Sequence, residues 1–389
     1  MTDAPVRSDD DFLVFGKPAI EQPEIDEVVD SIESGWLGTG PKVDRFEDQF
    51  AEYVGADHAL ALNSCTAALH LSLEVLDLEP GDEVVTTALT FCASVNSIIH
   101  AGGTPVLADV DAETMNIDPW SIERAITDDT VAIMPVHFAG RPANMGAIED
   151  LADAHDLTVV EDAAHAIETE WRGTSAGTLG DFGCFSFYAT KNVATGEGGM
   201  LTCEDPEIVR RLRRLSLHGM SRDAWGRYSS DGYSHYEVVE PGYKYNMIDL
   251  QAALGIHQLD RVDRNWERRC KIWASYQEAF DELPVRTPAP VADEHRHARH
   301  LYTILIDEQR AGLSRDEFID GLQEHNIGAG VHYPSLPEYP YYREQFGWDP
   351  ADYPDARRIG RRTVSLPIAP NLDDGDVADV IEASRRLLT

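Results

Sequence analysis

The sequence predicts an α/β protein, with a large domain built on a mostly parallel seven-stranded sheet and a smaller C-terminal α/β domain. Two observations carry this prediction. From about residue 57 to residue 205, short apolar runs alternate with helical stretches, which is typical of a parallel sheet covered on both faces. At 389 residues, the chain is also long enough to bury one large core and one smaller core.

Seven segments are predicted to be strands because they are short, apolar and rich in β-branched or aromatic residues. In chain order they are HALAL (58–62), DEVVTT (82–87), TPVLADV (104–110), VAIMPVHF (131–138), LTVVED (157–162), GCFSFYATKN (183–192) and GGMLTC (198–203). A Gly-rich turn joins the last two strands. The segment ANMGAIEDLADAHD (143–156) has apolar residues at helical spacing and is predicted to be one of the connecting helices.

The second domain is expected to begin close to residue 263. A helical stretch (249–270) is followed by a Pro-containing connector, PVRTPAPVADEH (284–295), and then by a new α/β pattern that starts with HLYTILID (300–307). We therefore divide the chain into a large domain (1–262) and a small C-terminal domain (263–389).

Acidic residues dominate the charge of the chain: 69 Asp and Glu stand against 32 Lys and Arg, a formal net charge of −37. Five of the basic residues are lysines. Negative charge spread along the whole chain favours solubility in concentrated salt, where self-repulsion is screened, so we expect a halophilic protein; a specific basic partner is the alternative. Nucleic-acid binding is disfavoured because the sequence offers no stripe of Lys and Arg for phosphate contacts.

The sequence also bears on location and on metal binding. It has no run of 18 apolar residues, and MTDAPVRSDDDF lacks the basic start and apolar core of a signal peptide. We therefore expect a cytoplasmic protein that does not bind membranes. The five cysteines include no C-x-x-C pair, so we expect reduced thiols, no disulfide framework and no metal site.

A possible phosphate-binding segment lies at NSCTAALHLSLEVL (63–76). A predicted strand ends there, and Asn63, Ser64 and Thr66 stand at the opening of an apolar helix. Free backbone N–H groups and hydroxyls at a helix N-terminus can hold a phosphate. Ordinary N-capping by Ser and Thr is the alternative interpretation.

A carboxylate follows the predicted strand LTVVED, where Asp162 stands at the carboxyl end. Open α/β sheets bind ligands at this edge. A carboxylate there can pair with a pyridinium nitrogen and keep the ring able to accept electrons from a carbanion. His165, one helical turn later, could then lie against the oxygen-bearing side of the ring. A helix cap is the commoner role of such a Glu-Asp pair.

Lys191 lies in FSFYATKNVATGEGGM, between two apolar strands and before a Gly-rich turn. A partly desolvated lysine amine is the group that forms a Schiff base with an aldehyde cofactor. In a chain with five lysines, this residue stands out as one required for its amine. Ser186, five residues earlier on the incoming strand, is placed for a phosphate contact.

These signals follow one another in a fixed order: the phosphate segment, TFCAS with Phe91, the carboxylate, and then the serine and lysine. NSCTAAL, EDAAHA, FSFYATKN with GEGGM, and GYKYNMIDLQAALG resemble the DegT family of nucleotide-sugar aminotransferases, which have the type I fold of pyridoxal-phosphate enzymes. The resemblance runs from about Phe15 to the C-terminus. It implies pyridoxal 5′-phosphate as the cofactor and a homodimer with a shared active site.

Carried over position by position, the resemblance implies that Lys191 holds the cofactor and moves the proton, that Asp162 pairs with the pyridine nitrogen and that His165 faces the ring oxygen. Phe91 would stack on the ring. Asn246 would reach the phosphate of the neighbouring subunit's cofactor. The phosphate would be held by the segment and strand residues Ser64, Cys65, Thr66 and Ser186.

Two further segments, WLGTGP and VHYPSL, occupy positions that line the sugar-nucleotide pocket in relatives. The residues concerned are Trp36, Leu37, Gly38, Thr39, His332 and Tyr333. A Gly-rich turn and a loop histidine are the alternative, purely structural interpretations.

The resemblance implies a two-stage exchange. L-glutamate gives its amine to the cofactor and leaves as 2-oxoglutarate, and a keto sugar on a nucleoside diphosphate then takes up the amine. Three features favour a 4-keto substrate: His165, DAWGRY and YEVVEPGYKYNM. They resemble the corresponding segments of enzymes in the arabinosamine and pseudaminic-acid pathways. Many C3 enzymes have Gln in place of His165. We expect a role in amino-sugar biosynthesis for a surface glycan or glycoprotein.

Alternative functions remain at this point. A C3-directed aminotransferase is one, and a pyridoxal-phosphate sugar dehydrase of the same fold is another, although those enzymes replace the lysine by histidine. A nicotinamide-dependent enzyme would need G-x-G-x-x-G, which GTGPKVD fails at the third glycine. A regulatory protein on the same scaffold is disfavoured because Lys191 and Asp162 are both present.

Overall fold

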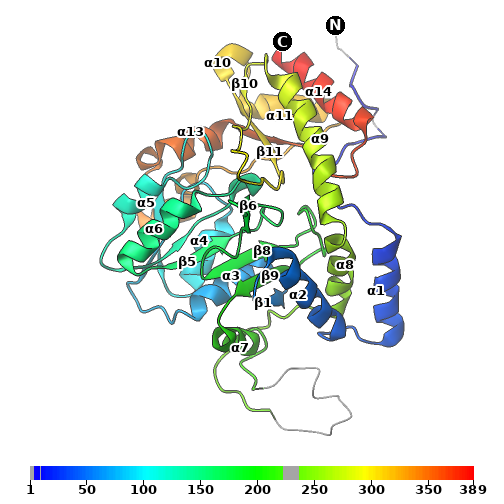
Figure 1. The fold of residues 1–389 in the computed structure, drawn as a ribbon. Coiled ribbons are helices and arrows are strands. Elements are labelled where there is room, and N and C mark those ends of the chain that lie inside the picture. Colours follow the sequence, from blue (N-terminus) through cyan, green and yellow to red (C-terminus); the bar gives the residue numbers. More distant parts are fainter. Residues whose placement is uncertain (1–3, 9, 222–235) are drawn as a thin grey trace.

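The structure is a computed structural model that describes residues 4–8, 10–221 and 236–389 (Figure 1). The segment DAWGRY (223–228), used above to favour a 4-keto substrate, lies outside the described residues.

A seven-stranded sheet forms the centre of the larger part of the molecule, with strand order β1-β9-β8-β5-β4-β2-β3. β9 runs antiparallel to β1 and β8, and the other neighbouring pairs are parallel. The mostly parallel sheet predicted from the sequence is thereby confirmed. Its strands are β1 (His58–Leu62), β2 (Glu83–Thr87), β3 (Thr104–Ala108), β4 (Thr130–Met134), β5 (Thr158–Asp162), β8 (Phe182–Ser186) and β9 (Gly199–Cys203).

Three strands end earlier than the apolar runs suggested, and the first of them, β3, ends at Ala108. β4 ends at Met134, because Pro135 has no N–H to continue the ladder. β8 ends at Ser186, and the chain then turns so that the Lys191 N–H donates to the carbonyl of Tyr188 at 2.8 Å. The early ends of β4 and β8 release polar residues from the sheet into the loops at its carboxyl edge.

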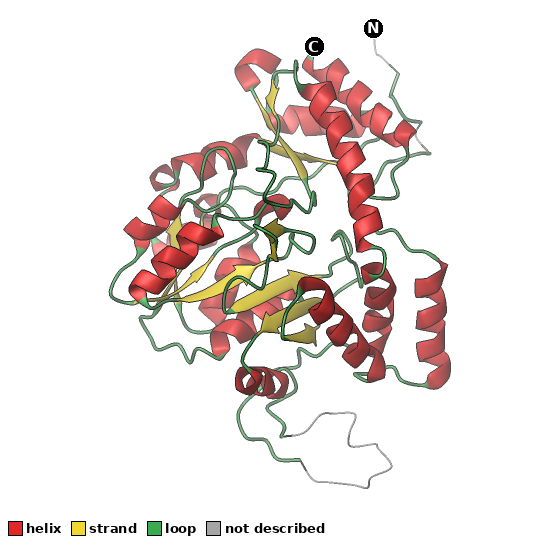
Figure 2. Cartoon of the chain, in the orientation of Figure 1, coloured by secondary structure: helices red, strands yellow, loops and turns green. Residues whose placement is uncertain are grey.

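Helices cover both faces of this sheet (Figure 2). Side chains alternate between the faces along each strand, so Leu60 and Leu62 pack with α3, whereas Ala59 and Ala61 pack with α2 and α8. α4 and α7 share the first face, and α5 and α6 cover the other half of the second face. The helices are α1 (Gln22–Ser34), α2 (Pro41–Val54), α3 (Cys65–Glu74), α4 (Cys92–His100), α5 (Pro119–Ala125), α6 (Met145–His155), α7 (Pro206–Leu215) and α8 (Asp249–Leu259).

The C-terminal part has its own antiparallel sheet, in the order β10-β11-β12. Its apolar core combines this sheet with α9, α11 and α14, and it also includes Leu13 from the N-terminal segment. The elements are α9 (Val262–Phe280), β10 (Val285–Arg286), β11 (Tyr302–Ile306), α10 (Glu308–Ala311), α11 (Arg315–Glu324), α12 (Pro340–Phe346), α13 (Pro354–Arg362), β12 (Thr363–Leu366) and α14 (Asp374–Leu388). A hairpin of β6 (Glu170–Trp171) and β7 (Thr174–Ser175) completes the strands.

The helical stretch 249–270 is two helices, because the chain breaks at Asp260 and Arg261, and α9 continues to Phe280. The predicted domain boundary between residues 262 and 263 falls at the start of α9 and stays a prediction. In the described ranges, no helix combines the length and the apolar character needed to cross a membrane.

Candidate active site

A cavity of about 350 Å³ lies where β5 and β8 end and α3 begins. This is the sheet edge at which open α/β folds bind ligands. The cavity is lined by ten of the residues predicted from the sequence: Ser64, Cys65, Thr66, Phe91, Asp162, His165, Ser186, Lys191, His332 and Tyr333. Residues up to 269 positions apart in the sequence therefore share one site.

Lys191 lies in the turn that follows β8 and lines the cavity. Burial lowers the pKa of its amine to about 8, while Cys65 and Asp162 act in the opposite direction. A partly buried amine with a lowered pKa has an accessible neutral form, which is the form that attacks a carbonyl carbon.

Asp162 is the last residue of β5 and is buried. The Ser94 hydroxyl donates to Asp162 Oδ2 at 2.8 Å, and the Ala164 N–H donates to Oδ1 at 3.2 Å. Burial raises the pKa of the carboxyl, and Ser94, Ala164 and Lys191 partly offset this rise. A carboxylate in such a place gains from a cationic ligand, because a positive partner compensates the lost hydration.

His165 is held from both sides. The Ala139 N–H donates to its Nδ1 at 3.3 Å, and Nε2 lies 3.3 Å from the Tyr333 hydroxyl. An N–H cannot accept, so Nδ1 is the acceptor and the neutral ring carries its proton on Nε2. Burial, Lys191 and His332 together hold the pKa of His165 well below its usual value. His165 is therefore a neutral donor toward the cavity.

The start of α3 supplies the second polar edge of the cavity. Ser64 is the N-cap, and its hydroxyl accepts from the Ala67 N–H at 3.1 Å, so the N-capping interpretation of Ser64 is correct. Capping leaves the first-turn N–H groups of Cys65 and Thr66 for a ligand. Gly199 lets β9 pack closely against the start of α3, since a Cβ there would clash with the Ser64 backbone and lie 2.5 Å from the Cys65 nitrogen. The Cys65 side chain itself donates to the Cys184 carbonyl at 3.4 Å.

Phe91 and His332 both line the cavity. Phe91 is 56% exposed, and its ring centroid lies 5.9 Å from that of Tyr333. His332 Nδ1 lies 2.8 Å from the Ser365 hydroxyl, and burial and Lys191 lower the pKa of His332 to about 4. The positions of both side chains allow the predicted roles, which stay predictions.

Five predicted residues are not brought to this cavity: Trp36, Leu37, Gly38, Thr39 and Asn246. The Asn246 amide donates to the Thr39 hydroxyl at 2.6 Å, and Thr39 donates to the Met247 carbonyl at 2.5 Å. The Gly38 carbonyl accepts from the Asp249 N–H. Thr39 and Asn246 instead line a small recess with Glu47 and Arg213.

Sequence reasoning missed two partners in the site. Ser94 lies three residues after Phe91, one helical turn into α4, and holds Asp162. The spacing of Phe91 and Ser94 in TFCAS is a signal that could have found it. Ala139 contacts His165 through its backbone N–H. A backbone contact leaves no side-chain signal in a sequence.

Residues 18–385 match the DegT/DnrJ/EryC1/StrS aminotransferase family. The chain belongs to this family. The match covers both parts of the molecule and therefore confirms the predicted resemblance along nearly its whole length.

Individual relatives agree with this membership. The chain is 52% identical over 378 residues to the spore coat polysaccharide biosynthesis protein SpsC of Bacillus subtilis (strain 168), with 97% of each protein covered. Spr1654 of Streptococcus pneumoniae, solved in its PLP form, superposes with a TM-score of 0.88 at 34% identity, over 97% of this chain and all of that chain. PseC of Helicobacter pylori, an aminotransferase involved in pseudoaminic acid biosynthesis, gives a TM-score of 0.90 at 25% identity, with 97% and 99% covered.

This DegT-family protein is a sugar aminotransferase that uses pyridoxal phosphate, as expected from the sequence. The residues present fit that cofactor. The buried Asp162 carboxylate suits a protonated pyridine nitrogen, the Lys191 amine suits the aldehyde carbon, and the first turn of α3 suits the phosphate.

Proposed function

We propose that this enzyme transfers the amine of L-glutamate to a 4-keto sugar linked to a nucleoside diphosphate, for a surface glycan or a glycoprotein. One observation carries the proposal: Lys191, Asp162 and His165 surround a single cavity in a member of this family. The relatives SpsC and PseC, with their printed roles in polysaccharide and pseudoaminic acid biosynthesis, support the substrate class.

In this proposal, each side chain has a distinct task. When bound, pyridoxal phosphate supplies an electron sink and carries the amine between the two substrates. Lys191 would hold the cofactor at rest and would move the proton at the reacting carbon. Asp162 would keep the ring nitrogen protonated, and His165 would offer its Nε2–H to the ring oxygen. Ser186 and the first turn of α3, with Ser64, Cys65 and Thr66, bind the phosphate.

A second recess supports a nucleotide-linked substrate. It has a volume of about 480 Å³ and shares Thr90, Phe91 and Tyr333 with the cofactor cavity. Its other walls include Tyr339 and Tyr341, which are 40% and 54% exposed. Exposed aromatic rings give a flat surface on which a base can stack. The sugar would then lie between the two cavities, beside His332 and Tyr333.

We also propose a homodimer in which each subunit completes the site of the other. Ile25, Val29 and Ile32 lie on one face of α1 at helical spacing and are 44% to 59% exposed; we call them the α1 stripe. Trp36 and Leu37 continue this apolar surface. A contiguous exposed apolar surface marks an interface. A second copy bound there would cover the stripe and bring the WLGTGP segment and Asn246 to its partner's cofactor.

The surroundings of the enzyme are part of the same proposal. Its five cysteines are all free, which agrees with a reducing cytoplasm. The net charge of −37 agrees with a cell interior rich in salt.

The decisive experiment combines the visible spectrum with a product assay. The protein reconstituted with pyridoxal phosphate is expected to show the absorbance band of a lysine-bound cofactor, and glutamate should convert it to the amine form. Lys191→Ala should lack the band, whereas Lys271→Ala, at an exposed position on α9, should keep it.

The amine-loaded enzyme is then mixed with 4-keto and 3-keto nucleotide sugars, and the products are read by mass spectrometry. Amination of the 4-keto sugar alone supports the proposal. Amination of the 3-keto sugar alone would show a C3-directed enzyme, and a band that survives in Lys191→Ala would refute the role of Lys191.

A further inference from the structure

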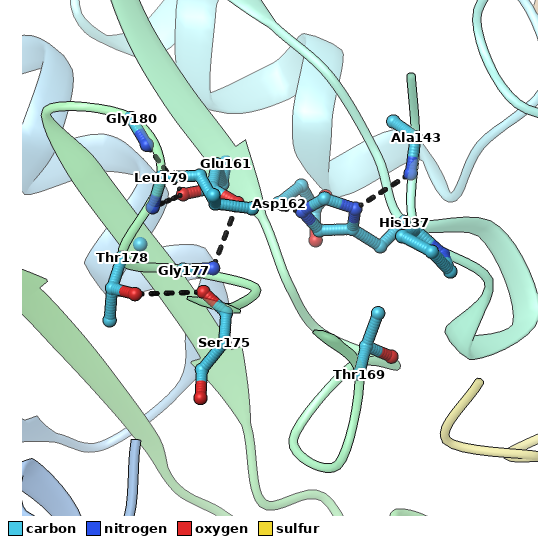
Figure 3. A network of polar contacts seen from close by, with 12 residues as sticks. His137, Ala143, Glu161, Asp162, Thr169, Ser175, Gly177, Thr178, Leu179 and Gly180 are labelled. Carbon is cyan, nitrogen blue, oxygen red and sulfur yellow. Dashed lines mark hydrogen bonds and ion pairs between the residues drawn. The ribbon is translucent and has the colours of Figure 1, made fainter. Parts of the chain in front are cut away.

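Glu161, the residue before Asp162, is a fully buried carboxylate surrounded by donors (Figure 3). Its Oε1 accepts from the N–H groups of Leu179 and Gly180 at 2.8 and 2.7 Å. Its Oε2 accepts from the Gly177 N–H at 2.8 Å and lies 2.8 Å from His137 Nε2. Four N–H groups therefore converge on the two oxygens, which is the full acceptor capacity of an ionised carboxylate.

The other member of this pair, His137, is also fully buried. The Ala143 N–H donates to its Nδ1 at 3.0 Å, so the neutral ring carries its proton on Nε2. That proton points to Glu161 Oε2. The pair thus has one defined arrangement of donors and acceptors, with both imidazole nitrogens used.

The backbone of His137 connects this pair to Asp162. The His137 N–H donates to the Asp162 carbonyl at 3.1 Å, and the Asp162 N–H donates to the Pro135 carbonyl at 2.8 Å. The end of β5, and with it the carboxylate of Asp162, is therefore held against the segment that carries His137.

The turn after His137 connects the pair to His165. It passes through Ala139 and Gly140, whose φ angles are 57° and 88°. A non-glycine residue in the left-handed region costs energy and persists where its surroundings hold it. The Ala139 N–H is the donor to His165 Nδ1 at 3.3 Å. The conformation of this turn therefore places the Ala139 N–H against Nδ1, and the proton of the neutral His165 ring is then on Nε2.

We propose that Glu161 and His137 are a positioning pair for transamination: Glu161 fixes His137, and His137 fixes both the end of β5 at Asp162 and the turn that makes His165 an Nε2–H donor. The inference rests on the roles proposed above for Asp162 and His165. A buried carboxylate is a poor way to gain stability, because taking a charge out of water is costly even when it is hydrogen-bonded. The pair is better explained by the single geometry that it imposes on its neighbours.

The test compares His137→Phe with two matched variants. His137→Phe keeps a buried ring but removes the donor to Glu161 and the acceptor for Ala143. His137→Gln restores an amide N–H and an oxygen in this position. Thr202→Val is the control, because the Thr202 hydroxyl donates to the Gly177 carbonyl and so anchors the same loop without contacting Glu161 or His137.

Two measurements on the protein with bound pyridoxal phosphate report the outcome. Nitrogen-15 spectra of labelled histidines give the tautomer of His165, assigned with His165→Gln. Single-turnover kinetics give the rate of the glutamate half-reaction and the Kd for glutamate. We expect His165 to lose its single Nε2–H form in His137→Phe. The saturated half-reaction should slow about 10- to 100-fold, the range seen when the outer partners that orient metal-binding side chains are removed, and the Kd should be nearly unchanged. His137→Gln should recover most of this rate.

Thr202→Val should lower the thermal midpoint and leave the tautomer and the rate unchanged. If His137→Phe lowers only the midpoint, as the control does, the pair is structural and the inference fails. If the tautomer changes but the rate does not, the inference fails at its catalytic step. If the wild type itself shows no glutamate half-reaction, the proposed function fails, while the tautomer of His165 still tests the positioning claim.

Discussion

The cavity around Lys191 and the surface formed by the α1 stripe with Thr39 and Asn246 are built in opposite ways. In the cavity, Asp162 and His165 accept hydrogen bonds from groups of their own chain. At the second region, the Asn246 amide donates to the Thr39 hydroxyl away from the cavity, and the segment just before Thr39 carries the exposed Trp36 and Leu37. The polar contacts described in the first region are all made within one chain. The second region would be covered by the second copy proposed above, because apolar area left in water favours association.

The largest effect is expected inside the cavity. Asp162→Asn should reduce the glutamate half-reaction by about 100-fold or more, the scale on which loss of one preorganised electrostatic contact acts. Stopped-flow absorbance measures this rate. A variant with wild-type rate would show that the carboxylate is not the partner of the ring.

The same variant should be more stable than the wild type when cofactor is absent. Burial raises the pKa of Asp162, so wild-type stability is complete below the carboxyl's unfolded pKa and falls as pH rises through its folded pKa. Asn carries no such penalty. Urea unfolding at neutral and acidic pH should show a gain at neutral pH that vanishes in acid, and a loss at neutral pH would contradict the expectation.

A charge in the α1 stripe should have the next largest effect. Val29→Asp combined with Ile32→Asp would place carboxylates in the proposed interface, and unpaired buried charge strongly opposes association. We expect monomers by analytical ultracentrifugation. Activity should fall to about one tenth of the wild-type value or below, because the partner contacts are lost. Glu33→Ala, an exposed polar position on the same helix, should remain dimeric. An active monomer would show that the cavity works without a second copy at the α1 stripe.

Removing Asn246 should have a smaller effect. Asn246→Ala is expected to raise the Kd for pyridoxal phosphate about tenfold, which corresponds to the loss of one hydrogen bond to a charged group. Equilibrium dialysis measures this change. Mixing Asn246→Ala with Lys191→Ala under exchange conditions should restore activity, because one of the two sites in a mixed dimer would then be intact. Failure to complement would place Asn246 outside the partner's site.

The smallest effect should come from salt. The net charge of −37 repels itself more strongly when screening is weak, so dilute buffer should lower the thermal midpoint by several degrees, on the order of 1 to 2 kcal/mol in unfolding free energy. Differential scanning calorimetry across a salt series checks this. A midpoint that does not change with salt would contradict the expected halophilic character.

Particular residues show how far sequence reasoning reached. It predicted Lys191, Asp162 and His165, which line one cavity, from short-range chemistry: an amine in a chain with few lysines, a carboxylate at a strand end, and a histidine one turn later. Sequence reasoning predicted no role for Glu161, because the groups that donate to the Glu161 carboxylate come from residues 16 to 24 positions away. It also did not show that the helical stretch breaks at Asp260 and Arg261.

The sequence by itself determined the α/β class, the seven strands, the family and the cofactor, because alternating apolar runs and short motifs are local patterns. The tertiary structure decided which of those motifs share a cavity. It brought His332 and Tyr333 to Lys191, and it left Thr39 and Asn246 on another surface. It also decided the tautomer of His165, since the backbone N–H of Ala139 reaches that ring through folding alone.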